Sequence, residues 1–285
     1  MVNPFVATLR FAAFVLLTLG FLPAYLTLGA LRTPRQARWA LVYWQVVTRA
    51  IGFRIRLHGT PATQGPVLFT ANHASYLDIV VLGSLIPGFF VAKTEVSGWP
   101  GFGFLARAAR TVFVDRKRGG SARERDLLRE RIDAGELLIL FPEGTSNDGN
   151  RVLPFKSSLF AVAQTPISGG RFLPVQPISI AYSRLDGLPL QRAFRPYYAW
   201  YGDMTLFGHL MAALGLGNVT IDVICHPVVT IAEFANRKGL AHHCHDVVQR
   251  GVIMALAGRL PPSGIPAAPT PAASSSPATP QPAGG

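Results

Sequence analysis

The chain has 285 residues, of which 49% are apolar, so it is long enough for one sizeable domain with extensions. Its two cysteines, Cys225 and Cys244, exclude a disulfide framework and indicate a reducing compartment for the main domain. The formal net charge of +12 comes mostly from scattered arginines without a nucleic-acid-binding signature, so it favours a membrane surface or an acidic substrate over nucleic acid.

The first 52 residues are predicted to anchor the chain to a membrane. Residues 11–31 carry no charge, and as a helix they would span about 31 Å, roughly the thickness of a bilayer core. Gly20, Pro23 and Gly29 interrupt this run, so a kinked spanning helix and a helix that dips into one leaflet both remain open. A cleaved signal peptide is less consistent, because the run is long and no clear small-residue cleavage site follows it.

The charges that flank this segment predict its orientation. Arg10 precedes it, whereas Arg32, Arg35 and Arg38 follow it. Because cytoplasmic flanks carry the excess of basic residues, we expect the domain that follows on the cytoplasmic side of the inner membrane. Residues 39–51 form a second expected helix, either at the membrane interface or packed on the domain.

From residue 53 onward, short apolar runs alternate with helical stretches. Strands are expected at 54–58, 67–70, 89–92, 111–114, 137–141, 173–181 and 220–225, and helices at 76–86, 99–109, 122–134, 155–164 and 231–260. This alternation predicts an α/β domain over residues 53–260, with a mostly parallel sheet flanked by helices. Residues 261–285 hold eight prolines and no charge, and are predicted to form a disordered tail.

A histidine and a carboxylate follow the expected strand at 67–70. His73 is of the residue type that takes a proton from a hydroxyl near neutral pH, and Asp78 would fix its tautomer and stabilise the imidazolium. Residues five apart do not share a helix face, so the pair requires His73 in the loop and Asp78 in the first helical turn. Ser75 and Asp78 also match a capping box, so a capping role for Asp78 remains open and is compatible with catalysis.

A second polar segment follows the expected strand at 137–141. Pro142 ends that strand, Glu143 places a charge at its carboxyl end, and Gly144 permits a left-handed backbone or the close approach of a substrate. The same residues, with Thr145, also make a good turn, so a purely structural role is the alternative.

Four blocks occur in order along the chain: His73 to Asp78, residues 112–116, residues 141–145 and residues 173–178. Together they resemble the motifs of the lysophosphatidic acid acyltransferase family, the 1-acylglycerol-3-phosphate acyltransferases, over residues 53–260. The resemblance implies a glycerolphosphate acyltransferase-like fold. It also implies transfer of an acyl group to a lysophospholipid hydroxyl, giving phosphatidic acid. Acyl-CoA or acyl carrier protein would be the co-substrate, and no metal or other cofactor is expected.

The resemblance also implies residue roles. His73 matches the catalytic base and Asp78 its partner. The substrate-binding positions are Arg116 for the acceptor phosphate, Glu143, Gly144 and Thr145 for the shape of the acceptor site, Lys156 as the basic residue after the third block, and Pro174 in the last block on the acyl side. Without the resemblance, Arg116 and its basic neighbours would be interpreted as a solvated turn.

Two positions depart from the family pattern. Arg110 stands where the second block usually begins with glycine, and Ser146 stands where the third block usually continues with arginine. The missing arginine weakens the case for a glycerol phosphate acceptor, unless Arg110 or Lys156 compensates for it. Because bacterial relatives acylate lyso-ornithine lipid, that lipid is the alternative acceptor.

Two further functions remain open from the sequence. A non-catalytic lipid-binding protein could keep the fold, although the intact His73 and Asp78 argue against it. An esterase or thioesterase would use the same base but release free fatty acid. The histidine-rich run at 242–245 does not predict a metal site, because adjacent residues on a helix point in different directions.

Overall fold

The computed structural model describes residues 2–31, 33, 35–98, 102–114, 122–167 and 169–260. Arg116 and the predicted disordered tail at 261–285 lie outside these residues.

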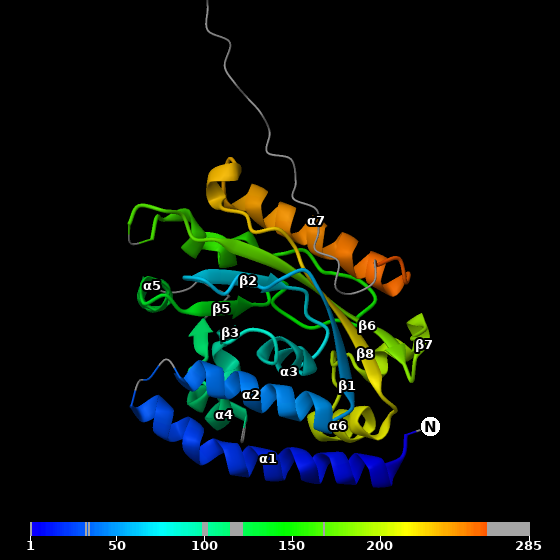
Figure 1. The fold of residues 1–285 in the computed structure, drawn as a ribbon. Coiled ribbons are helices and arrows are strands. Elements are labelled where there is room, and N and C mark those ends of the chain that lie inside the picture. The colour runs from blue at the N-terminus through cyan, green and yellow to red at the C-terminus, as the bar shows by residue number, and fades with distance from the viewer. Residues whose placement is uncertain are drawn as a thin grey trace, which may run out of the picture.

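The centre of the molecule is an eight-stranded sheet with the order β1-β8-β6-β2-β5-β3-β4, in which the short β7 pairs with β6 (Figure 1). The strands are β1 (Phe53–His58), β2 (Val67–Ala71), β3 (Phe89–Lys93), β4 (Val112–Val114), β5 (Leu137–Leu140), β6 (Val175–Leu185), β7 (Leu188–Pro189) and β8 (Val219–Cys225). Strands β6, β2, β5, β3 and β4 run parallel in succession, whereas β8 is antiparallel to β6. The predicted mostly parallel α/β sheet is therefore confirmed.

Helices cover both faces of the sheet. The α-helices are α1 (Pro4–Ala30), α2 (Arg35–Ala50), α3 (Leu77–Gly83), α4 (Phe102–Ala108), α5 (Ala122–Asp133), α6 (Leu206–Gly215) and α7 (Arg237–Leu256), and the 3₁₀ helices are η1 (Thr94–Gly98), η2 (Ser157–Gln164), η3 (Arg192–Tyr197) and η4 (Ile231–Glu233). Helix α7 lies on one face, and α2, α3 and α6 lie on the other, with α1 outermost (Figure 1).

The core is correspondingly divided between the two faces. Along β2, Val67, Phe69 and Ala71 belong to the cluster under α2 and α3, whereas Leu68 belongs to the cluster under α7. Such a strand is apolar on both sides, as expected for the centre of a parallel sheet.

Two expected helices differ from the prediction. The helix expected at 155–164 is a 3₁₀ helix. The helix expected at 231–260 begins as an α-helix only at Arg237, where the Asn236 side chain accepts from Lys238 N and Gly239 N.

Helix α1 runs without a break through Gly20, Pro23 and Gly29, and by length and composition it is long and apolar enough to cross a membrane. It lies antiparallel to α2 (Figure 1), with the Phe21 and Trp39 rings 5.0 Å apart. Its exposed large apolar side chains recur at helical spacing: Phe5, Leu9, Leu16, Leu19 and Leu26. This apolar helix indicates association with a membrane.

Arg10 connects α1 to the rest of the molecule. Its guanidinium donates to the carbonyl oxygens of Leu214, Leu216 and Gly217 at 2.7–3.2 Å and to Asn218 Oδ1 at 3.1 Å. These acceptors lie at the end of α6 and in the loop before β8, so α1 is held against the domain by polar contacts as well as by packing.

Candidate active site

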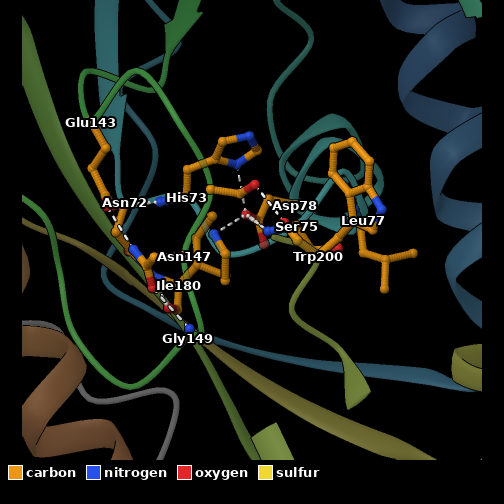
Figure 2. Close-up of polar contacts among 12 residues, drawn as sticks. Asn72, His73, Ser75, Leu77, Asp78, Glu143, Asn147, Gly149, Ile180 and Trp200 are labelled. Atoms are coloured by element: carbon orange, nitrogen blue, oxygen red, sulfur yellow. Dashed lines mark hydrogen bonds and ion pairs between the residues drawn. The ribbon is translucent and has the colours of Figure 1, made fainter. Parts of the chain in front are cut away.

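Two loops meet at the carboxyl edge of the central strands. His73 follows β2, and Glu143 follows the neighbouring parallel strand β5. Carboxyl ends of adjacent parallel strands lie at the same edge of a sheet, which is where α/β proteins place their ligands. Figure 2 shows these two loops with the side chains of His73, Asp78 and Glu143.

His73 and Asp78 form a hydrogen-bonded pair. The distance from His73 Nδ1 to Asp78 Oδ2 is 2.9 Å. A carboxylate only accepts, so Nδ1 carries the proton and Nε2 is left with a free lone pair. The side chain of Asp78 is 0% exposed and that of His73 is 21% exposed. The histidine is therefore partly exposed, while the carboxylate that holds it is fully buried.

Asp78 also organises the backbone of the loop. Its Oδ2 accepts from Ala74 N at 2.8 Å and from Ser75 N at 2.9 Å, while its Oδ1 accepts from Tyr182 OH at 2.9 Å. The contact with Ser75 N is one half of the capping box that the sequence suggested. The capping role and the pairing with His73 thus coexist in one carboxylate.

Phe141 sets the orientation of the His73 ring. The two rings stack with centroids 4.1 Å apart and an interplanar angle of 16°. The Phe90 ring in turn stacks with Phe141, with centroids 6.2 Å apart. An imidazole that is hydrogen-bonded at one nitrogen and stacked on one face has few orientations left, which is the kind of preorganisation that a catalytic base requires.

Glu143 is buried beneath the pair, with 2% of its surface exposed. Its Oε1 accepts from the backbone N–H of His73 at 2.7 Å, and its Oε2 accepts from Asn147 Nδ2 at 2.6 Å and Leu153 N at 2.9 Å. Burial raises the pKa of Glu143 to about 7, because the loss of hydration outweighs these three donors. Both oxygens are engaged by the protein, so the carboxylate joins the His73 loop to the segment at 147–153.

We expect this carboxyl to leave a signature in the pH dependence of stability. The folded protein binds the Glu143 proton more tightly than the unfolded chain does. The stability of the wild type, relative to that of a Glu143→Gln variant, should therefore fall as the pH rises from about 4.5 to about 7 and level off above that range. Thermal denaturation of both proteins in detergent, at a series of pH values, measures this difference.

Glu95 provides the matched control for this experiment, because it is exposed. A Glu95→Gln variant should follow the pH profile of the wild type. If Glu143→Gln also followed it, the carboxyl of Glu143 would not titrate in the way its burial requires.

The structure places three more of the predicted residues beside this loop. Gly144 has φ +78°, so its backbone favours glycine, and a Cβ there would lie 2.7 Å from Nζ at the flexible end of the Lys156 side chain. Lys156 donates its backbone N–H to Pro142 O at 2.9 Å, and its side chain is exposed. Thr145 is exposed as well. Their roles in binding substrate remain predictions.

Pro174 lies elsewhere. Its carbonyl oxygen accepts from Leu68 N at 2.9 Å, which places it at the amino ends of β6 and β2, away from His73.

Arg110 has φ +54°, a left-handed backbone conformation that explains why the family usually has glycine at this position. Its guanidinium pairs with Glu136 at 2.7 Å and lies over the Phe89 ring, so its charge is already partly neutralised by the protein.

Two contributors to the site were missed from the sequence. Tyr182 reaches Asp78 from β6, and Asn72 joins its loop to the same strand, donating to Ile180 O at 2.9 Å and accepting from Ile180 N at 2.8 Å. Asn72 could have been identified from the sequence because it is next to His73, whereas no local sequence feature identifies Tyr182. Among the described residues, no group of three His, Cys, Asp or Glu side chains is placed to hold a metal ion.

A buried carboxylate paired with a histidine at the carboxyl edge of a parallel sheet is an arrangement suited to taking a proton from a hydroxyl. Comparison with known proteins gives the class. The family model described as Acyltransferase matches residues 54–181. The lyso-ornithine lipid O-acyltransferase of Brucella abortus strain 2308 is 40% identical over 252 residues, covering 87% of this chain and 94% of that protein. The chain belongs to the acyltransferase family.

Other relatives differ in their named acceptor. The lyso-ornithine lipid O-acyltransferase of Rhizobium meliloti strain 1021 is 39% identical, covering 84% of this chain and 83% of that protein. The 1-acyl-sn-glycerol-3-phosphate acyltransferase of Neisseria gonorrhoeae is 32% identical, covering 67% of this chain and 72% of that protein. The crystal structure of the 1-acyl-sn-glycerophosphate acyltransferase PlsC from Thermotoga maritima matches with a TM-score of 0.58 and 19% identity, covering 88% and 96% of the two chains, which shows a shared fold.

Proposed function

We propose that this protein transfers a fatty acyl group from a thioester, carried by CoA or by acyl carrier protein, to the hydroxyl of lyso-ornithine lipid. The observation that carries the proposal is the similarity to two proteins of that name, at 40% and 39% identity over most of the chain. The relative named for 1-acylglycerol 3-phosphate is less similar and covers less of the chain. The comparison therefore favours the second of the two acceptors that the sequence suggested.

Ser146 is consistent with this acceptor. The phosphate-directed family usually has an arginine at this position, whereas the Ser146 hydroxyl here donates to the carbonyl oxygen of Trp200. A guanidinium binds phosphate through two parallel charged hydrogen bonds, and a serine that is already engaged with the backbone cannot replace it.

The reaction follows from the geometry of the pair. His73 Nε2 takes the proton of the acceptor hydroxyl while the oxygen attacks the thioester carbonyl carbon. Asp78 stabilises the imidazolium that forms, through the bond to Nδ1. The tetrahedral intermediate then collapses, the carbon–sulfur bond breaks, and the thiolate takes the proton back from Nε2. The ester forms, His73 returns to its neutral state, and no enzyme nucleophile is acylated.

The membrane supplies the acceptor in this proposal. Helix α1 carries an exposed row of apolar side chains, and the arginines that follow it favour a cytoplasmic position for the domain. A lysolipid would then reach the site from the leaflet that contacts α1, and the thioester would approach from the aqueous side.

A panel of acceptors tests the function. Purified protein in detergent is given acyl-CoA or acyl carrier protein thioester with lyso-ornithine lipid, lysophosphatidate or no acceptor. We expect acylated ornithine lipid and stoichiometric thiol release with the first acceptor, and little product with the second. Acylation of lysophosphatidate alone would overturn the proposed acceptor, and free fatty acid as the main product would overturn acyl transfer in favour of hydrolysis.

A further inference from the structure

Two segments lie beside Ala74, the residue next to the catalytic histidine. Asn147 donates its backbone N–H to His73 O at 3.2 Å, and a Cβ at Gly149 would lie 3.6 Å from that of Ala74. Trp200 donates its backbone N–H to Ala74 O at 2.8 Å, and a Cβ at Gly149 would also lie 3.7 Å from that of Ala199. The loop at 147–150 and the segment at 195–200, which begins in η3, therefore both lie next to the residue that follows His73.

These segments bring one acid and one base close together. Arg195 Nη1 donates to Asn150 Oδ1 at 2.6 Å. Asp148 accepts from Asn150 through its backbone N–H at 3.1 Å and its Nδ2 at 3.2 Å. Asn150 thus stands between the two charges. The described residues show no direct ion pair between Asp148 and Arg195. Burial and the neighbouring charge of Arg192 lower the pKa of Arg195, and the Asp148 carboxylate opposes that shift.

Both charged groups keep unused hydrogen-bonding capacity. Arg195 Nε is buried, and it has no hydrogen-bond partner among the described residues. The hydrogen bonds of the Asp148 carboxylate within the described region come from Asn150 alone. A buried donor without a partner costs about 1–3 kcal/mol, so the Arg195 Nε–H calls for a partner such as a water molecule or a bound group.

We propose that Asp148 and Arg195 form the head-group subsite of the acceptor, Asp148 binding an ammonium group and Arg195 a carboxylate of an amino-acid head group. The inference rests on the proposed function, because an ornithine acylated on its α-nitrogen keeps one carboxylate and one side-chain ammonium. Opposite charges held apart by Asn150 complement such a zwitterion, and the guanidinium fork matches the planar carboxylate.

The same pair disfavours a phosphate monoester. Asp148 would face a dianion at close range, and like charges at close range raise the free energy of binding. Together with Ser146, this makes the loop after β5 selective for a head group that carries a positive charge.

Steady-state kinetics of the full-length protein with lyso-ornithine lipid test the subsite. Asp148→Asn removes the charge and keeps the shape, so KM for this acceptor should rise about 10- to 100-fold, as expected for the loss of one charged hydrogen bond, with little change in kcat. Arg195→Gln should raise KM by a similar factor, also with little change in kcat. Asp203→Asn and Arg54→Gln change exposed charges elsewhere and serve as controls that should leave KM unaltered.

The KM for a modified acceptor distinguishes a role in binding from a merely structural role. Lyso-ornithine lipid acetylated on its side-chain nitrogen lacks the ammonium, so the wild type should bind it about 10- to 100-fold more weakly. Asp148→Asn should no longer distinguish the two acceptors. Equal KM values for both acceptors in the wild type would overturn the subsite, even if the variants failed to fold. A wild type that does not acylate lyso-ornithine lipid at all would instead overturn the proposed function.

Discussion

A His73→Ala variant is expected to lose about 10²- to 10⁴-fold in kcat for acyl transfer, because no other group would take the proton from the acceptor hydroxyl. The ring also stacks on Phe141 without being fully buried, so its removal should leave the fold intact. The measurement is the initial rate of acylated lipid formation, with thiol release followed in parallel, and the thermal denaturation midpoint checks the fold.

His242→Ala is the matched control for this variant. His242 is an exposed histidine on α7 that pairs with Asp246 at 2.9 Å. It should retain wild-type activity. Full activity of His73→Ala on a lysolipid would show that another group is the base and would overturn the mechanism.

Two substitutions of Asp78 should separate its charge from its hydrogen bonds. In Asp78→Asn, the amide oxygen can take the position of Oδ2, where three N–H groups converge, and the amide nitrogen can face the Tyr182 hydroxyl, which can accept. The loop is then kept, but the imidazolium loses its counter-charge, so kcat should fall about 10- to 100-fold with an unchanged melting temperature.

Asp78→Ala should behave differently, because it leaves the backbone N–H groups of Ala74 and Ser75 without their acceptor. Each such buried donor costs about 1–3 kcal/mol, so this variant should melt earlier and lose nearly all activity. Tyr182→Phe removes only the hydrogen bond to Asp78 Oδ1, so it serves as the control for the loss of a single contact of Asp78. Equal stability of the Asn and Ala variants would contradict the bracing role that we assign to Asp78.

Much of the fold was predictable because its signals are local. Short apolar runs bounded by turn residues marked the strands, and β2 and β5 are apolar on both sides, as central parallel strands are. The pairing of His73 with Asp78 was also predictable, since five residues and one loop determine it.

The remainder depends on contacts between distant residues. The antiparallel position of β8 beside β6 has no signature in either strand alone. Tyr182 stands 104 residues from Asp78, and only the register of β6 brings them together. Helix α6 spans only ten residues that are mostly apolar, and a short apolar run does not by itself distinguish a helix from a buried strand.

Glu143 shows a different limit of sequence interpretation. A charged residue at the end of a strand is expected to face solvent or substrate, because isolated buried carboxylates are rare. Here three N–H donors from its own surroundings make the buried position acceptable. Those donors come from the His73 loop and from the segment at 147–153, and their convergence could not be read from the turn sequence.

The attachment of α1 has a consequence for anyone who wishes to study this enzyme without its membrane segment. Ala7 is 1% exposed, and the approach of α1 to α6 is so close that a Cβ at Gly215 would lie 3.3 Å from that of Ala7. Helix α1 therefore also covers part of the protein interior. Deleting it would uncover apolar surface on α2 and α6 and leave the carbonyl groups that Arg10 satisfies without their donor. Solubility is therefore better sought by changing the outward row of apolar side chains than by shortening the chain.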